Sequence, residues 1–217
     1  MLDRLRRALG SSIGSKALMA CTGLLLIGFL IAHLAGNLLL YADSEGRAFD
    51  AYASTLENSP LLPAAEAGLA LLFCVHIVLA VRVQRANREA RDVAYRARSS
   101  HGARTPGSAT MVATGVIVLL FLLAHLYDFR INRPDGDSLA LIVRERLASP
   151  SGLAVYSIGV AALGLHLTHA LRSALQTLGL HRPGYEGLID KASLLLGIVL
   201  GLAFWSFPLV FFLGGAA

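Results

Sequence analysis

Four histidines lie deep inside long apolar segments of this 217-residue chain, one in each of four segments: His33, His76, His125 and His166. An imidazole in the hydrocarbon of a membrane has no water to bond, so it is costly there unless something binds it. Imidazole is also a frequent ligand of transition metals and of haem iron. The four positions therefore predict a buried cofactor site assembled from several helices.

The composition is typical of an integral membrane protein. Hydrophobic residues make up 55% of the chain and charged residues only 15%. A helix needs about 20 apolar residues to cross a bilayer, and five segments are long enough. They are residues 16–41, 61–83, 109–131, 152–171 and 192–213. We predict one all-α domain, residues 1–217, with five transmembrane helices joined by short loops.

The basic side chains predict the orientation in the membrane. Most of the 19 Lys and Arg residues lie in the N-terminal arm and in the loops after the second and fourth segments. Such loops are usually cytoplasmic, so we expect the N-terminus inside a bacterial cytoplasmic membrane and the C-terminus outside. The net charge of +5 is explained by this bias, and we expect no nucleic-acid partner.

Depth in the membrane sorts the histidines into pairs. At about 1.5 Å per helical residue, His33 and His125 share the outer half, and His76 and His166 share the inner half. In an antiparallel bundle of the first four helices, the first helix lies opposite the third and the second opposite the fourth. Two facing imidazoles are what a six-coordinate haem iron needs, which predicts two haem b groups. Alternatively, each histidine bonds a neighbouring helix or a cavity water. Zinc is disfavoured, because no carboxylate or thiolate joins either pair.

Three further side chains at the inner end are candidates for contact with the inner haem. His169 lies one turn beyond His166, and we expect it to be a neighbour of the haem rather than an iron ligand. Arg172 and Arg82 each follow an inner histidine by six residues, where they would meet haem propionates. The alternative for both arginines is that they anchor helix ends at the lipid headgroups.

Four runs of the sequence carry a family resemblance. They are SSIGSKALMACTGLLLIGFLIAHLAGNLLLY (Ser11–Tyr41), LLPAAEAGLALLFCVHIVLAV, MVATGVIVLLFLLAHLYDFRI and LHLTHALRSALQTLGL. In order and spacing, over nearly the whole chain, they resemble the cytochrome b558 membrane-anchor subunit of succinate dehydrogenase and fumarate reductase, in its single-chain, five-span, di-haem form. The resemblance implies two b haems, with His33 and His125 as axial ligands of the outer one and His76 and His166 as those of the inner one.

The resemblance also implies a function. In this family the subunit anchors a flavoprotein and an iron–sulfur subunit on the cytoplasmic face. Electrons from succinate pass through the haems to a quinone, which we expect to be menaquinone, and so link the tricarboxylic acid cycle to the respiratory chain. The subunit binds no dicarboxylate and is not catalytic alone. A higher oligomer of the complex stays open.

The quinone site has two candidate positions. Glu66 lies just inside the outer end of the second segment, where a carboxylate could exchange protons with a quinone or could simply bond a helix end at the interface. Ser12, Ser15 and Lys16 are the candidates at the inner face. Gly164 stands where some fumarate-reducing relatives have a Glu that is proposed to move protons, so we expect this chain to lack that route.

Two other classes of protein stay open. A di-haem b subunit of a hydrogenase or a formate dehydrogenase would have similar helices but different partners. A haem-free transporter would be colourless and would usually show internal repeats, which we do not expect in this chain.

Overall fold

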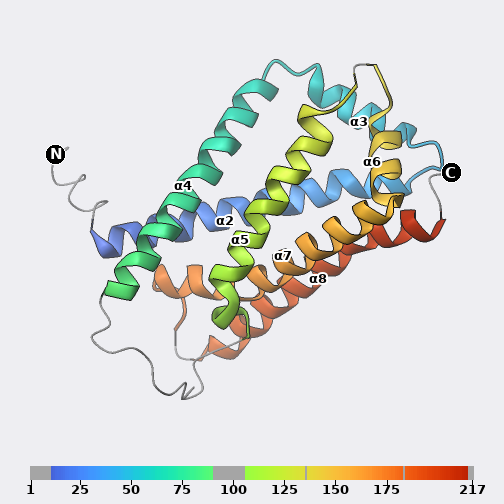
Figure 1. The fold of residues 1–217 in the computed structure, drawn as a ribbon. Helices are drawn as coiled ribbons and strands as arrows, with labels where there is room; N and C mark the ends of the chain where they lie inside the picture. The colour runs from blue at the N-terminus through green and yellow to red at the C-terminus, as the bar shows by residue number, and fades with distance from the viewer. Residues whose placement is uncertain (1–10, 90–105, 135, 183, 215–217) are drawn as a thin grey trace.

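The computed structural model describes residues 11–89, 106–134, 136–182 and 184–214. Within these residues, five long helices dominate the fold (Figure 1). They are α2 (Ser12–Asn37), α4 (Leu62–Glu89), α5 (Pro106–Leu126), α7 (Pro150–Thr177) and α8 (Glu186–Gly214). All five are long and apolar enough to cross a membrane, so the prediction of five such helices is confirmed.

The helices differ from the predicted segments mainly at the ends that the sequence predicts to face the cytoplasm, which are called inner here. At the opposite, outer ends, a 3-10 turn, η1 (Leu38–Tyr41), follows α2 and a π-helical turn, η2 (Tyr127–Ile131), follows α5, both within the predicted segments. The α4 helix continues to Glu89, α7 continues to Thr177, and α8 begins at Glu186. Hydropathy marks only the part of a helix that lies in hydrocarbon, whereas the backbone hydrogen bonds continue into the polar zone.

Two short helices occur where the sequence predicted plain loops, and that prediction was wrong. They are α3 (Arg47–Glu57) and α6 (Leu139–Ala148), and they lie near each other at one end of the molecule (Figure 1). Asp50 of α3 accepts the backbone N–H of Ala140 at 2.8 Å, while the Ser138 hydroxyl accepts that of Leu141 at 3.1 Å. These bonds cap the first turn of α6, and one of them comes from another helix.

The start of α3 is fixed by a carboxylate that precedes it. Asp43 accepts the backbone N–H groups of Arg47 and Ala48, each at 2.9 Å. Gly46, immediately before the helix, has a φ of 75°, a left-handed conformation that glycine adopts without strain. The two N–H donors, first Ala48 and then Arg47, hold the pKa of Asp43 below its usual value.

The spanning helices pack around α2 and α7. The α4 helix packs on α2, α5 packs on α7, and α2 and α7 also touch each other, while α8 packs mainly on α7 (Figure 1). These neighbours are those of an antiparallel four-helix bundle with α8 outside it. The α4 and α5 helices pack on α2 and α7 rather than along each other. That this bundle binds haem stays a prediction.

Glycines allow α7 and α8 to approach closely. A Cβ atom placed on Gly197 of α8 would lie 2.6 Å from the Thr168 side chain and 2.7 Å from the Gly164 carbonyl oxygen. One placed on Gly164 would lie 3.2 Å from the Gly197 carbonyl oxygen. Gly164 therefore faces α8, and a glutamate at this position would have to separate the two helices.

One buried arginine closes the outer end of α2. Arg144 of α6 is 7% exposed, and its guanidinium donates to the carbonyl oxygens of Leu40 and Asp43 at 2.8 Å each and to that of Ser44. Carbonyl groups at a helix C-terminus have no partner in their own helix. Arg144 supplies one, and it binds the turn after α2 to α6.

Candidate functional site

The two outer histidines face each other. The ring centres of His33 in α2 and His125 in α5 are 5.8 Å apart, and the ring planes are at 90°. With metal–nitrogen bonds of about 2 Å on each side, two imidazoles that share one metal have ring centres about 6 Å apart. The Nδ1 atom of His125 is buried and has no hydrogen-bond partner among the described residues. The separation fits two axial ligands of one iron.

Aromatic rings surround the outer pair. Phe29 stacks on His33 with ring centres 5.4 Å apart, and the Phe204 ring centre is 6.0 Å from that of His33. Phe121 and Phe129 lie 6.0 and 5.3 Å from His125 by the same measure. A wall of flat apolar rings suits a flat apolar cofactor and keeps water away from it.

The inner histidines are each held by a threonine of a neighbouring helix. His76 of α4 and His166 of α7 lie within electrostatic range of each other. The Nδ1 atom of His76 is 3.0 Å from Oγ1 of Thr22 in α2. The Nδ1 atom of His166 is 3.3 Å from Oγ1 of Thr114 in α5. Both inner histidines thus have a polar partner at Nδ1, which leaves Nε2 available to a metal.

The two threonines were missed in the sequence, although an internal repeat marks them. Residues 19–34 (MACTGLLLIGFLIAHL) and 111–126 (MVATGVIVLLFLLAHL) share Met, Thr-Gly, Phe and Ala-His-Leu at equivalent positions. The expectation of no internal repeat was therefore wrong. Parallel repeats also occur in transporters, so repeats do not separate the two classes. In this repeat, however, the shared polar residues are the threonines and histidines that meet inside the bundle.

The residues predicted to contact haem propionates lie at the inner end, and Arg172 among them forms an ion pair. The Nε atom of Arg172 lies 2.9 Å from Oδ1 of Asp190 in α8, and Nε2 of His181 lies 3.5 Å from the same oxygen. His169 is within electrostatic range of Arg172 and Asp190. Arg82 is exposed on α4. The structure thus gathers His169 and Arg172 near Asp190, a residue that sequence reasoning did not single out.

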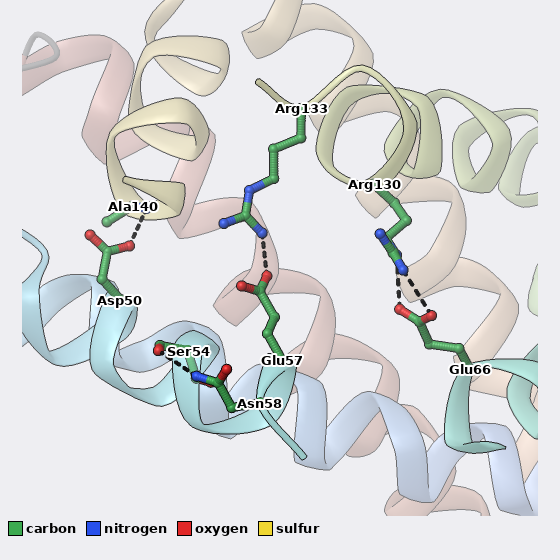
Figure 2. A network of polar contacts seen from close by, with 8 residues as sticks. All are labelled: Asp50, Ser54, Glu57, Asn58, Glu66, Arg130, Arg133 and Ala140. Carbon is green, nitrogen blue, oxygen red and sulfur yellow. Dashed lines mark hydrogen bonds and ion pairs between the residues drawn. The ribbon is translucent and has the colours of Figure 1, made fainter. Parts of the chain in front are cut away.

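At the outer end, Glu66 forms an ion pair between two helices. Figure 2 shows Arg130 of η2 with both of its bonds to this carboxylate, Nε to Oε1 at 2.8 Å and Nη2 to Oε2 at 3.0 Å. Beside it, Arg133 pairs with Glu57 of α3 (Figure 2). The interfacial alternative for Glu66 was a bond to a helix end; the carboxylate instead bonds the side chain of Arg130, which adds Arg130 to any quinone site there.

A second polar cluster lies next to the outer histidines. The Oδ2 atom of Asp128 accepts the Tyr156 hydroxyl at 3.0 Å and Nε of Arg146 at 2.8 Å. The Tyr156 ring centre is 6.1 Å from that of His125. Asp128 lies in the π-helical turn, and such turns are frequent at functional sites. Asp128 lies near the end of the predicted segment 109–131, and no pattern in the sequence indicated its partners.

At the inner face, one of the three candidate residues stands out. Ser15 is 3% exposed, and its Oγ atom has no hydrogen-bond partner among the described residues. Ser12 is exposed, and Lys16 is partly exposed. A buried hydroxyl without a partner is costly, so a ligand that forms a hydrogen bond with the Ser15 hydroxyl would gain stability from it.

One curated protein shows a distant similarity to the chain. The "Succinate dehydrogenase hydrophobic membrane anchor subunit" of Archaeoglobus fulgidus is 29% identical over 91 residues, which are 41% of this chain and 77% of that protein. No protein-family model and no solved structure matches the chain. The similarity is thus to a membrane anchor of succinate dehydrogenase. Together with the five apolar helices, it indicates a multi-pass membrane protein.

Proposed function

We propose that this chain is the membrane-anchor cytochrome b subunit of a succinate:quinone oxidoreductase in a bacterial cytoplasmic membrane. The observation that carries the proposal is the approach of His33 and His125, whose ring centres lie 5.8 Å apart inside two apolar helices. The similarity to a named succinate dehydrogenase anchor supports the kind of complex. The subunit reacts with quinone as part of the complex and is not catalytic alone.

Two haem b groups are the proposed cofactors. His33 and His125 would hold the outer haem, and His76 and His166 would hold the inner one. Bound haem supplies one-electron redox chemistry. The chain supplies the ligating nitrogens, the aromatic wall that excludes water, and cationic neighbours at the inner end. Arg172 and Arg82 are the proposed propionate contacts.

His169 is proposed to assist those contacts and not to ligate iron. It lies one helical turn from His166 on the same helix, close to Arg172 and Asp190. A cationic group balances the charge of a carboxylate most effectively where water is partly excluded. The ion pair of Arg172 with Asp190 leaves other donors of the guanidinium available to an anionic group.

The proposed electron path begins at an iron–sulfur subunit, which binds with a flavoprotein at the cytoplasmic face, and ends at a quinone, menaquinone in our proposal. The two candidate quinone contacts are Glu66 with Arg130 at the outer end and, at the inner end, the hydroxyl of Ser15, which has no partner among the described residues. A protonated carboxyl group and a hydroxyl can both donate a hydrogen bond to a quinone oxygen.

The test is a reduced-minus-oxidised visible spectrum with a haem count on the chain purified with its partners. We expect about two non-covalent b haems per chain and copurification of a flavin-bearing subunit. Haem together with hydrogenase or formate dehydrogenase subunits would instead favour the di-haem subunit of another respiratory enzyme. A colourless protein that still holds its partners would contradict the cytochrome proposal and favour a transporter.

A further inference from the structure

The two inner histidines differ at Nδ1 from His125 of the outer pair. Each inner histidine has a threonine hydroxyl at Nδ1, Thr22 for His76 at 3.0 Å and Thr114 for His166 at 3.3 Å. At the outer pair, the Nδ1 atom of His125 is buried without a partner among the described residues. The inner histidines are thus distinguished by hydrogen bonds to a neighbouring helix, in addition to their predicted depth in the membrane.

The hydroxyl protons are already used within the helices that carry the threonines. Oγ1 of Thr22 donates to the carbonyl oxygen of Met19 at 3.0 Å. Oγ1 of Thr114 lies 3.0 Å from the carbonyl oxygen of Thr110 and 3.1 Å from that of Met111, and it donates to this pair. A hydroxyl has one proton and two lone pairs, so a threonine that donates to a carbonyl accepts from the histidine.

This direction favours one tautomer of both rings. When the hydroxyl proton is donated to a carbonyl, His76 and His166 bond the threonine by carrying their proton on Nδ1 and donating it, and a neutral imidazole then has its free lone pair on Nε2. Gly23 and Gly115, which follow the threonines, lie against the two rings. A Cβ atom on Gly23 would lie 3.4 Å from Cε1 of His76.

We propose that Thr22 and Thr114 are positioning residues that hold His76 and His166 in the Nδ1-protonated form, so that Nε2 of each is the nitrogen offered to a metal. The inference rests on the proposed function, since it concerns ligands of the inner haem. A hydrogen bond donated by the far ring nitrogen makes an imidazole a stronger ligand. A stronger ligand favours oxidised iron, so the two threonines lower the reduction potential of the inner haem.

The internal repeat supports this role for both threonines together. Each threonine precedes the histidine of its own helix by eleven residues and contacts the histidine of the next spanning helix. The arrangement therefore occurs twice, once between α2 and α4 and once between α5 and α7. A threonine that served only its own helix would not need a histidine opposite it in both copies.

The test uses the holoprotein and the variants Thr22→Val and Thr114→Val, which keep the shape and remove the hydroxyl. Thr22→Ser and Thr114→Ser restore the hydroxyl. Thr177→Val is the control, because the Thr177 hydroxyl bonds the Ser173 carbonyl of its own helix and Thr177 is the last residue of α7. The readouts are a potentiometric titration of the b-haem absorbance and the electron paramagnetic resonance spectrum of the oxidised haems.

The inner component is identified as the one that disappears in His76→Ala. We expect each valine variant to raise the potential of that component and shift its resonance, or to release that haem alone. The outer component should stay unchanged, and the serine variants should restore the wild-type values. Full haem content with both components unchanged would overturn the inference, and so would equal shifts of the two. A wild-type protein without haem would overturn the proposed function itself. That result is distinct from any result of the threonine variants, which are compared with a haem-containing wild type.

Discussion

His33 and His125 meet ring to ring at 5.8 Å although their helices, α2 and α5, do not pack closely on each other. Both helices pack on α7 instead, and the space between them is filled by the two imidazoles and their phenylalanine neighbours. Helices that are held apart by a third helix leave room at the bundle axis. This is where two ligands of one metal have to face each other.

The close contact of glycines between α7 and α8 predicts that a bulky side chain at Gly164 lowers the stability of the protein. Gly164→Leu places a side chain against the α8 backbone, where a Cβ atom alone would already lie 3.2 Å from the Gly197 carbonyl oxygen. Overpacking of this kind costs about 1–3 kcal/mol. Thermal unfolding in detergent, followed by circular dichroism, should show a lower melting temperature. Gly28→Leu is the control, because a Cβ atom on Gly28 has no neighbour within 4 Å. Equal losses in the two variants would contradict this account.

Arg144 should be important for stability even though it lies outside the spans. Arg144→Ala removes the donor for the carbonyl groups of Leu40, Asp43 and Ser44 at a site that is only 7% exposed. Hydrogen bonds from charged groups contribute about 1.5–3 kcal/mol each, and we expect a net loss of about 3 kcal/mol in the free energy of unfolding. Arg47→Ala, at an exposed arginine, should change stability little. The idea fails if the two variants unfold alike.

Glu66 has two possible roles, contact with a quinone or an ion pair with Arg130 that only links two helices, and substitutions can distinguish them. Exposed ion pairs contribute only about 0–1 kcal/mol, so Glu66→Gln should leave stability almost unchanged. If Glu66 exchanges protons with quinone, Glu66→Gln lowers quinone reduction severalfold, and the exchanged pair Glu66→Arg with Arg130→Glu does not restore it. Steady-state quinone reduction by the purified complex is the measurement. Full activity in Glu66→Gln would remove Glu66 from the quinone site and leave Ser15 as the remaining candidate.

Asp43 makes the start of α3 sensitive to acid. Its pKa is held below the usual value by the N–H groups of Ala48 and Arg47, so its stabilising effect is fully present above the unfolded pKa of about 3.9. The effect is lost as the pH falls through the lower, folded value. Amide hydrogen exchange of Arg47 and Ala48 should therefore show protection at neutral pH that disappears in strong acid. In Asp43→Ala we expect weak protection at every pH; protection equal to that of the wild type would refute this role.

The sequence predicted those features that depend on one segment at a time. Apolar length gave the five helices, and the constant rise of a helix placed His33 and His125 at one depth. Contacts between segments could not be predicted. Asp50 caps α6 from another helix, and Arg130 reaches Glu66 across two helices. No local pattern encodes such pairs, because each depends on how the helices pack.

The threonine partners were closer to being predictable. Thr22 and Thr114 occupy equivalent places in an ungapped repeat, so a comparison of the first and third spans would have found them. The similarity is masked by interchangeable aliphatic residues, which every membrane span shares. The histidine that each threonine contacts could not have been inferred, since it depends on the rotation of two helices about their axes.

The central claim is that four histidines hold two haems in two defined pairs. The most direct measurement is the haem count with the reduced-minus-oxidised spectrum of purified His33→Ala, His76→Ala, His125→Ala and His166→Ala, with His169→Ala as the matched control. We expect His33→Ala and His125→Ala to lose the same spectral component, His76→Ala and His166→Ala to lose the other, and His169→Ala to keep both. Full haem content in any one of the four variants, or losses that join His33 with His76, would contradict the account.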